Sequence, residues 1–397
     1  MAREYPAANG AAFSMLLRTF LTRPTTSRRR AITVAARAMP ASSVMFGGVW
    51  IGPGSGVERG DGDRADLGQP NADATVAAAL DASIVEFDTA PWYGAGASEE
   101  RLGRALARLR PGPSCLVITK AGRLFREPDG ATPCRAGFDA PGRAPLSSRV
   151  CANDFTAAGA RTSLAESLER LGLGAAGVRL GLRIHDPNDN SNNRVSSERF
   201  HEDEVGTALD GERGMVAGLS ALRAEGAIAH VGLGMNCNRE GHMGAPEEVV
   251  RLVNGAAPET FDSALLAGGW NLLSQAGLPC YSACEARGVA VHVAGVFASG
   301  LLAHEEGLYA YRAAPTQLLE RAARWRELAA RRGHALPALA IAFATLPACV
   351  DRVVIGMATP DQVRENLEWL AESAEVAPDV WHEAKAVGLL DARVPTP

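Results

Sequence analysis

Four polar residues of different chemical types lie at or just after short apolar runs in the first half of the sequence. Asp88 ends the largely apolar run 84–87, and Tyr93 follows it on the next loop. Lys120 ends a second run, and His185 ends a third. Brought together, they would offer a carboxylate, a phenol, an ammonium group and an imidazole.

This combination could transfer protons. A free phenol has a pKa of about 10, too high for a base at neutral pH, and a nearby lysine ammonium would lower that pKa. A carboxylate would keep the lysine charged and directed at the phenol, while a neutral imidazole would orient a carbonyl or hydroxyl. Because the set includes neither metal ligands nor an activated Ser or Cys, it points to Tyr93 as general acid and base. The hydride would be carried by a nicotinamide cofactor.

Each residue also has an ordinary structural explanation. Asp88 could cap a helix, Tyr93 could fill a loop, and His185 could be a satisfied turn residue. Lys120 is harder to explain this way, because only Lys120 and Lys385 are lysines among 40 basic residues. A lysine pKa can shift, whereas guanidinium stays charged. Four such residues at neighbouring strand ends favour a functional explanation.

The elements that position these residues follow from the alternation of short apolar runs with helical periodicity. Strands are expected at 44–50, 83–88, 115–120, 180–185, 228–233, 261–266, 289–294 and 352–356. Helices are expected at 74–80, 98–109, 158–171, 208–225, 247–253, 276–287, 316–332, 337–346 and 361–370. Eight strand–helix units predict an α/β fold, a (β/α)8 TIM barrel with extra C-terminal helices. A doubly wound sheet is the alternative, but no Gly-x-Gly-x-x-Gly turn follows an early strand.

The N-terminal region differs from the rest of the chain. Residues 1–42 contain seven arginines, many hydroxyl residues and a single acid, Glu4. Such a composition is typical of an organelle transit peptide, with a disordered extension or a misassigned start as alternatives. We therefore expect one barrel domain over 43–397 in a cytoplasmic protein, or in a plastid or mitochondrial one if the extension is a transit peptide. The long segments 121–153 and 187–207 are expected to be lid or substrate loops.

Composition narrows the possible partners. The net charge of -5 argues against a general nucleic-acid binder. No apolar run approaches the roughly 20 residues that a membrane span needs. The seven cysteines lack zinc-site spacing and are expected to be free thiols, so no metal is expected. A small-molecule substrate is the expected partner, and the oligomeric state is left open.

Several motifs resemble those of the aldo-keto reductases. These are Asp-Thr-Ala-Pro followed by Tyr-Gly at 88–94, Ser-Glu at 98–99, Ser-Leu-Glu-Arg-Leu-Gly at 167–172, and the segment 356–366. This family consists of (β/α)8 NAD(P)-dependent oxidoreductases with an Asp, Tyr, Lys and His tetrad, and the likeness extends over about 44–370. It implies that Asp88, Tyr93, Lys120 and His185 are catalytic.

Other positions are similar to the sugar 1-dehydrogenase branch of that family. They are His-Asp-Pro at 185–187, Asp-Phe at 154–155, Leu-Leu-Ala at 265–267 and Val-Ile-Gly-Met at 354–357. The resemblance implies oxidation of the anomeric hydroxyl of an aldose to a lactone, with substrates of the L-galactose, L-fucose or D-arabinose type.

The resemblance also implies a cofactor site. Gly356 and Gln362 stand where NADP-preferring relatives carry a Lys and an Arg that grip the 2′-phosphate, and Met357 lies between them. Because a phosphate without cations would be poorly bound, NAD is expected, while Arg364 keeps NADP possible. The other cofactor positions are Asn236 (after Met235) at the carboxamide, Glu365 and Asn366 at the adenosine, and Trp270 as an apolar wall beside the ring or, equally, a core aromatic.

Two departures from the pattern bear on the site. The approach 174–181 is longer than usual and lacks the usual Asp, which could displace His185. The Asn-rich stretch 188–193 leaves the substrate fit open. The alternatives are an aldehyde or ketone reductase, a pyridoxal dehydrogenase, or a non-catalytic redox-sensing or scaffold protein. An intact tetrad counts against the last.

Overall fold

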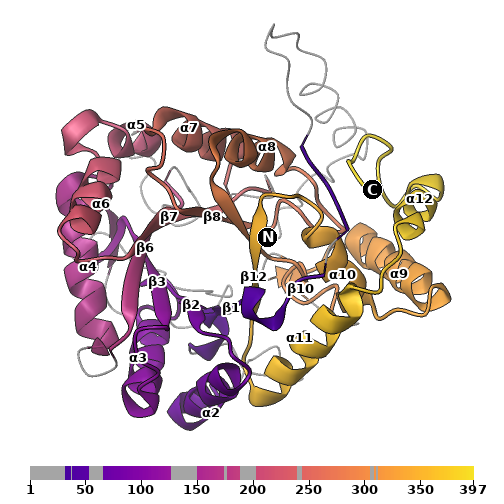
Figure 1. The fold of residues 1–397 in the computed structure, drawn as a ribbon, viewed down its shortest axis with the longest axis horizontal. Helices are drawn as coiled ribbons and strands as arrows, with labels where there is room; N and C mark the ends of the chain where they lie inside the picture. The colour runs from indigo at the N-terminus through magenta and orange to yellow at the C-terminus, as the bar shows by residue number, and fades with distance from the viewer. Residues whose placement is uncertain are drawn as a thin grey trace, which may run out of the picture. The chain divides into compact units, whose positions relative to one another are not determined.

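Eight parallel strands close into a barrel in the computed structural model. It describes residues 32–36, 38–52, 66–126, 150–173, 177–187, 203–238, 244–304, 308–309 and 312–397. The barrel strands are β1 (Val44–Gly47), β2 (Glu86–Asp88), β3 (Leu116–Ala121), β6 (Arg179–His185), β7 (His230–Asn236), β8 (Ser263–Ala267), β9 (Ala290–Ala294) and β12 (Val350–Gly356). They neighbour one another in chain order, and β12 pairs with β1 to close the ring (Figure 1). The predicted TIM barrel is confirmed, and the doubly wound sheet is excluded.

Helices surround the strands (Figure 1). They are α2 (Gly68–Asp81), α3 (Ala97–Leu109), α4 (Ala157–Leu171), α5 (Glu204–Ala208), α6 (Met215–Ala224), α7 (Pro246–Gly255), α8 (Leu278–Arg287), α9 (Thr316–Arg331), α10 (Leu336–Ala344), α11 (Pro360–Ser373) and α12 (Asp379–Ala386). The pair α9 and α10 follows the seventh barrel strand, and α12 follows α11, so the expected extra C-terminal helices are present. No helix in the described part of the chain is long and apolar enough to span a membrane.

The helix expected at 208–225 is found only in part, because α6 covers Met215–Ala224 whereas residues 209–214 form no α-helix. A short 3-10 helix, η4 (Gly211–Arg213), lies between α5 and α6. A Cβ at Gly214 would lie 2.4 Å from the Ala208 carbonyl oxygen. The backbone therefore passes too close to itself here for any larger residue, and the extended conformation of Gly214 (φ -78°, ψ 159°) interrupts the helix.

The first barrel strand is shorter than expected. After Gly47 the chain turns into a 3-10 helix, η2 (Gly48–Ile51), instead of continuing to Trp50. A Cβ at Gly48 would lie 2.8 Å from the Asp88 carbonyl oxygen. This close approach brings Trp50 over the carboxyl ends of the strands.

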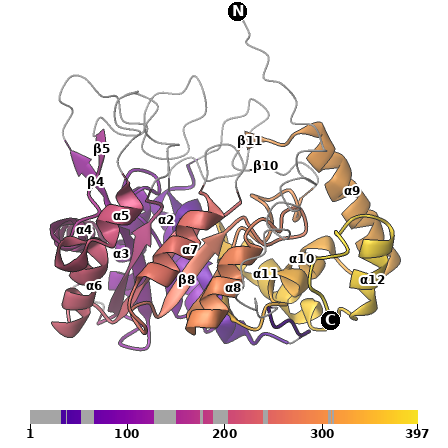
Figure 2. The same ribbon diagram turned by 90° about the horizontal axis from the view of Figure 1, so that it is seen from above.

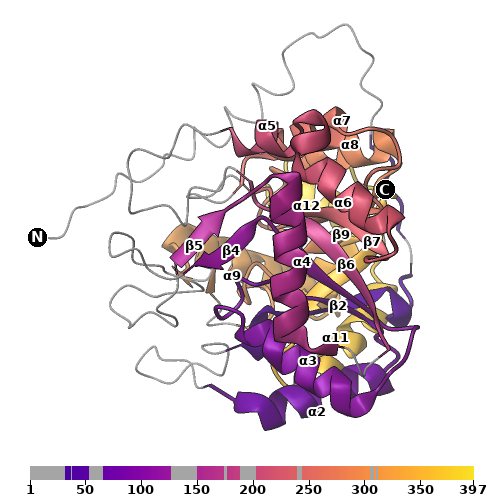
Figure 3. The same ribbon diagram turned by 90° about the vertical axis from the view of Figure 1, so that its left-hand side faces the viewer.

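Two small hairpins lie on the same side of the barrel, at the top of Figure 2. They are β4 (Arg123–Arg126) with β5 (Val150–Asn153), and β10 (Leu308–Tyr309) with β11 (Arg312–Ala313). In Figure 3 the β4–β5 hairpin projects beside α4. The expected loops 121–153 and 187–207 thus follow strand ends, but their central parts, 127–149 and 188–202, lie outside the described residues.

The folded unit begins before the boundary expected at 43. Ile32 is buried in the core, Ala35 N donates to Leu346 O at 3.0 Å, and Ala348 N donates to Thr33 O at 2.8 Å. The compact unit runs from Ile32 to the end of the chain. Residues 1–31 and 37, on which the transit-peptide expectation rests, lie outside the described residues.

Candidate active site

Three of the predicted catalytic residues meet at the ammonium group of Lys120. Its Nζ lies 2.6 Å from Asp88 Oδ1, 2.8 Å from Thr89 O and 3.1 Å from Tyr93 OH. Both Lys120 and Asp88 are almost completely buried. The β2–β3 register pairs Asp88 with Ile118, so Lys120 lies two residues further along, at the carboxyl end.

The environment of Tyr93 differs from the sequence-based expectation. Burial raises the pKa of the Tyr93 phenol well above its usual value, and the carboxylates of Asp88 and Asp186 raise it further, against Arg183 and Arg123. The expected lowering of this pKa is wrong, because the sequence argument counted the ammonium but not the loss of water. Without a cofactor, Tyr93 is therefore a protonated phenol at neutral pH.

His185 ends β6 and meets Tyr93 edge-on, with ring centroids 6.1 Å apart. Burial holds the His185 pKa well below its usual value, helped by the charges of Arg123 and Lys120, so the imidazole is neutral. Its Nδ1 has no hydrogen-bond partner within the described residues. The strand keeps its register with β7, where His185 pairs with Gly234. The longer approach at 174–181 therefore does not remove His185 from the site, although 174–176 lie outside the described residues.

A buried glutamate of α3 links that helix to α4 and to β3. Glu99 has no exposed surface and accepts hydrogen bonds from Thr119 Oγ1 and Arg170 Nε, each at 2.5 Å. Ser98 Oγ donates to Gly48 O at 2.7 Å. The motif residues at 98–99 and 170 therefore act structurally, because they fix η2 and the residue before Lys120.

A cavity of about 560 Å³ opens at the carboxyl ends of the strands, within the range of ligand pockets. Asp88 and Tyr93 line one part of it. Five of the predicted cofactor positions also line it: Asn236, Gly356, Gln362, Glu365 and Asn366. The structure thus brings these five together with the tyrosine, from β7, β12 and α11.

Asn236 is held by a neighbouring carboxylate. Asp186 accepts from the Asn236 backbone N at 2.7 Å and from its Nδ2 at 2.9 Å. Asp186 adopts a left-handed backbone, with φ of 43°. With one Nδ2 hydrogen engaged, the Asn236 side-chain oxygen and the second Nδ2 hydrogen are left for a ligand.

The segment after β12 is arranged around Trp50 and Gln362. A Cβ at Gly356 would lie 2.0 Å from Trp50 Cδ1, so no side chain fits there while the indole is in place. Gln362 Oε1 accepts from Ala358 N at 2.7 Å. Arg364 is exposed and paired with Asp361.

One predicted cofactor residue is corrected, and the role of another is limited to its backbone. Trp270 is completely buried, stacks on Phe343 with centroids 4.8 Å apart, and donates Nε1 to Phe343 O at 3.1 Å. It is a core aromatic, the alternative that the sequence allowed. The Met357 side chain is also fully buried in the core, so only its backbone is available to a ligand.

The sequence interpretation missed two arginines next to the tetrad. Arg183 has no exposed surface and donates to Asp88 Oδ2. Arg123 lies over the Trp92 ring at 5.5 Å and donates to Asp186 O at 3.3 Å. The signal for Arg183 was present: an arginine two residues before His185 in a buried strand must face the same side of the sheet.

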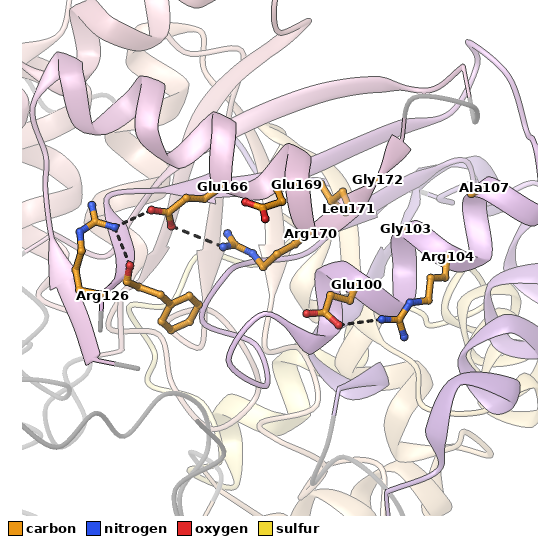
Figure 4. Close-up of a pocket in the computed structure, with 11 residues that line it drawn as sticks. Glu100, Gly103, Arg104, Ala107, Arg126, Glu166, Glu169, Arg170, Leu171 and Gly172 are labelled. Carbon is orange, nitrogen blue, oxygen red and sulfur yellow. Dashed lines mark hydrogen bonds and ion pairs between the residues drawn. The ribbon is translucent and has the colours of Figure 1, made fainter. Parts of the chain in front are cut away.

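A second hollow, of about 760 Å³, lies outside the barrel beside α3 and α4 (Figure 4). Its charged side chains pair with one another, as Arg126 with Glu166 and Arg104 with Glu100 (Figure 4). No residue of the tetrad lines it. The barrel mouth, and not this hollow, is therefore the candidate active site.

Comparisons with known proteins agree with this geometry. A D-threo-aldose 1-dehydrogenase of a Pseudomonas species is 34% identical over 337 residues, covering 83% of this chain and 91% of that protein. A pyridoxal 4-dehydrogenase of Microbacterium luteolum is 31% identical, covering 82% of this chain and 90% of that protein. An L-galactose dehydrogenase of Arabidopsis thaliana is 26% identical, covering 79% of this chain and 82% of that protein.

A solved structure and a family profile are also similar to this chain. The structure of a glycerol dehydrogenase from Gluconobacter oxydans superposes with a TM-score of 0.57 at 22% identity, covering 94% of this chain and 98% of that one. The profile of the Aldo/keto reductase family matches residues 56–387. The chain therefore belongs to the aldo/keto reductase family and is an NAD(P)-dependent oxidoreductase.

Proposed function

We propose that the protein oxidises the anomeric hydroxyl of an aldose to the lactone, with NAD as the preferred cofactor and Tyr93 as the general acid and base. One observation carries the proposal. The hydroxyl of Tyr93, a residue that lines the cavity, lies 3.1 Å from an ammonium that is itself bound to Asp88. The substrate class rests on the relatives, two of which are named as sugar dehydrogenases.

The residues present fit a dinucleotide. Gly268 and Gly295 line the cavity and approach each other closely, because a Cβ at Gly295 would lie 2.8 Å from Gly268 N. This leaves the wall free of side chains there. The Asn236 oxygen would accept from the carboxamide, and Glu365 and Asn366 would face the adenosine. Bound there, the nicotinamide would take the hydride from the anomeric carbon.

The lining of the cavity supports NAD over NADP. No Lys or Arg is among the described residues that line it, whereas Asp88 and Glu365 are. The 2′-phosphate of NADP, beside the adenosine, would meet the Glu365 carboxylate without a compensating cation. Arg364, the residue that kept NADP open, is paired with Asp361.

The protein supplies the proton chemistry. In the oxidative direction the phenolate of Tyr93 would take the hydroxyl proton, while Lys120 stabilises the negative charge on the phenolate oxygen. The neutral His185 would orient the sugar oxygen at the phenol. Asp88 would keep Lys120 charged despite burial, which by itself lowers the Lys120 pKa.

A substrate panel tests this proposal. Purified protein is assayed with L-galactose, L-fucose and D-arabinose, with NAD and NADP side by side. We expect NADH formation, and its loss in Tyr93→Phe. Tyr281→Phe is the matched control, since it removes a hydroxyl from a buried tyrosine that lies outside the cavity. Absence of turnover with every aldose would refute the proposal.

A second candidate is an aldehyde dehydrogenase or reductase activity on the same site. The pyridoxal 4-dehydrogenase relative, at 31% identity, is the observation that favours it. Adding pyridoxal and simple aldehydes to the panel, in both directions, separates the two. Pyridoxal turnover at a higher kcat/KM than any sugar would select this second function.

A further inference from the structure

A buried arginine occupies the barrel interior beneath the tetrad. Arg183 lies in the middle of β6 and has no exposed surface. Strand alternation directs Arg183 and His185 to the same side. The interior of such barrels is usually filled by branched aliphatic side chains. A guanidinium in that place costs free energy unless it is paired, so its partners decide its role.

Those partners come from four other strands. Arg183 Nη1 donates to Asp88 Oδ2 at 2.5 Å, and Nη2 lies 2.6 Å from His292 Nδ1. Since a guanidinium can only donate, His292 Nδ1 is the acceptor and the His292 ring carries its proton on Nε2. Ser263 Oγ lies 3.4 Å from Nη2, and the sulfur of Met45 lies 3.9 Å away.

Neighbouring glycines make room for two cations. A Cβ at Gly234 would lie 2.9 Å from Lys120 Cε and 3.5 Å from Arg183 Cβ. A Cβ at Gly232 would lie 3.4 Å from Arg183 Cγ. The Gly-x-Gly sequence in β7 therefore leaves the space in which both long side chains lie.

Asp88 forms ion pairs with two cations. Its Oδ1 binds Lys120 and its Oδ2 binds Arg183. Burial holds the His292 pKa well below its usual value and lowers that of His230 to about 4, so neither adds charge. One carboxylate and two cations leave this group with a net charge of +1.

We propose that Arg183 is a positioning residue for the catalytic tyrosine, which fixes Asp88 through its second oxygen and places an additional positive charge under the phenol. The charge stabilises the phenolate, the form that oxidation needs. The role of Arg183 in catalysis rests on the proposed function of Tyr93. Its effect on the ionisation of the phenol does not depend on that function.

Other charged and titratable groups around Tyr93 and Arg183 also affect the ionisation of the Tyr93 phenol. Tyr93 is faced by Lys120 from β3, Asp88 from β2, His185 and Asp186 at the end of β6, and Arg123 from β4. Arg183 is faced by Asp88 and Glu86 from β2, His230 from β7, Ser263 from β8 and His292 from β9. Asp186 has Arg123 within 3.6 Å and Glu86 has Arg352 at 3.0 Å, so each of these acids is paired with a cation other than Arg183.

The test titrates Tyr93 directly. Arg183→Gln removes the charge and keeps a donor toward Asp88, while Arg183→Lys keeps a charge. In each background the tyrosinate absorbance of the Tyr93→Phe counterpart is subtracted, which isolates Tyr93. Arg179→Gln is the control, because Arg179 is an exposed residue on the same strand.

We expect the midpoint of the Tyr93 titration to rise by about one pH unit in Arg183→Gln. In Arg183→Lys and Arg179→Gln it should stay near that of the wild type. Oxidative kcat/KM at neutral pH should fall about tenfold with the midpoint, while the cofactor Kd stays unchanged. Arg183→Met is the second neutral variant if Arg183→Gln does not fold. An unmoved midpoint in a folded neutral variant, or equal shifts in the Gln and Lys variants, overturns the proposal. If instead Tyr93→Phe keeps its turnover, the proposed function fails while the titration still reports on Arg183.

Discussion

The indole of Trp50 lies directly over Gly356. A Cβ added at Gly356 would lie 2.0 Å from Cδ1 and 2.4 Å from Nε1 of that ring. Both residues line the cavity. The glycine is therefore required by the tryptophan, and any substitution at 356 must displace the indole before a new side chain can meet a ligand.

Gly356→Ala should displace Trp50 and weaken cofactor binding. Forcing a methyl into this contact costs about 1–3 kcal/mol of stability, and a shifted indole changes the cavity wall. Thermal unfolding and tryptophan fluorescence titrated with NADH measure the two effects. Gly52→Ala is the control, because a Cβ at Gly52 meets its nearest atom at 3.6 Å. Equal Kd values for Gly356→Ala and Gly52→Ala would contradict the expectation.

The rates of the oxidative and reductive directions should depend differently on pH. Because burial raises the pKa of Tyr93, the phenol form needed for reduction predominates at neutral pH, and the phenolate needed for oxidation increases as pH rises. Oxidative kcat/KM should therefore rise across pH 6–10 and reductive kcat/KM should stay flat until the phenol ionises. His185, neutral throughout, should add no step near its usual value. An oxidative rate that falls with pH would be inconsistent with Tyr93 as the base.

Lys120→Arg should lower kcat by a factor on the order of 10² to 10⁴, the usual contribution of a positioned acid–base group. The larger guanidinium has no room, since even a Cβ at Gly234 would approach Lys120 Cε to 2.9 Å. Lys385→Arg is the matched control, because Lys385 is the only other lysine of the chain. Steady-state kinetics of both variants decide the matter, and comparable kcat values in the two would count against this role for Lys120.

Glu99→Ala should destabilise the fold by about 3 kcal/mol, because it removes the partner that lies 2.5 Å from the largely buried Arg170 and leaves it only the longer contact with Glu166, at 3.7 Å. Thr119 loses its acceptor as well, so activity should fall with stability. The neighbouring Glu100→Ala removes an exposed i,i+4 pair with Arg104, which is worth about 0.5 kcal/mol or less. Urea unfolding of both variants gives the comparison, and a difference under about 1 kcal/mol would argue against a structural role for Glu99.

The barrel and the positions of the four tetrad residues could be predicted because their signals are local. The short apolar runs of the strands and the polar residues that end them can be recognised in the sequence without knowledge of the packing. Parallel barrels bring those strand ends together. That is why Asp88, Tyr93 and Lys120 were identified and are found in contact.

The features that the sequence did not predict correctly depend on long-range packing. Whether Trp270 faces a ligand or Phe343 is decided by a residue 73 positions away, and the pKa of Tyr93 is decided by how completely the folded chain excludes water. Arg183 looked like an ordinary member of an arginine-rich chain, although its strand position marked it as interior. Each of these follows from neighbours that sequence periodicity does not specify.

The short segment at Ile32 limits where the chain can be cut. Thr33 and Ala35 share backbone hydrogen bonds with the residues just before β12, and Ile32 fills part of the core. A processing peptidase that cleaved near residue 42 would strip this segment from the barrel and expose the apolar surface beneath it. A cleavage site compatible with a stable mature enzyme must therefore lie upstream of Ile32, and purification tags are better removed there than at the first barrel strand.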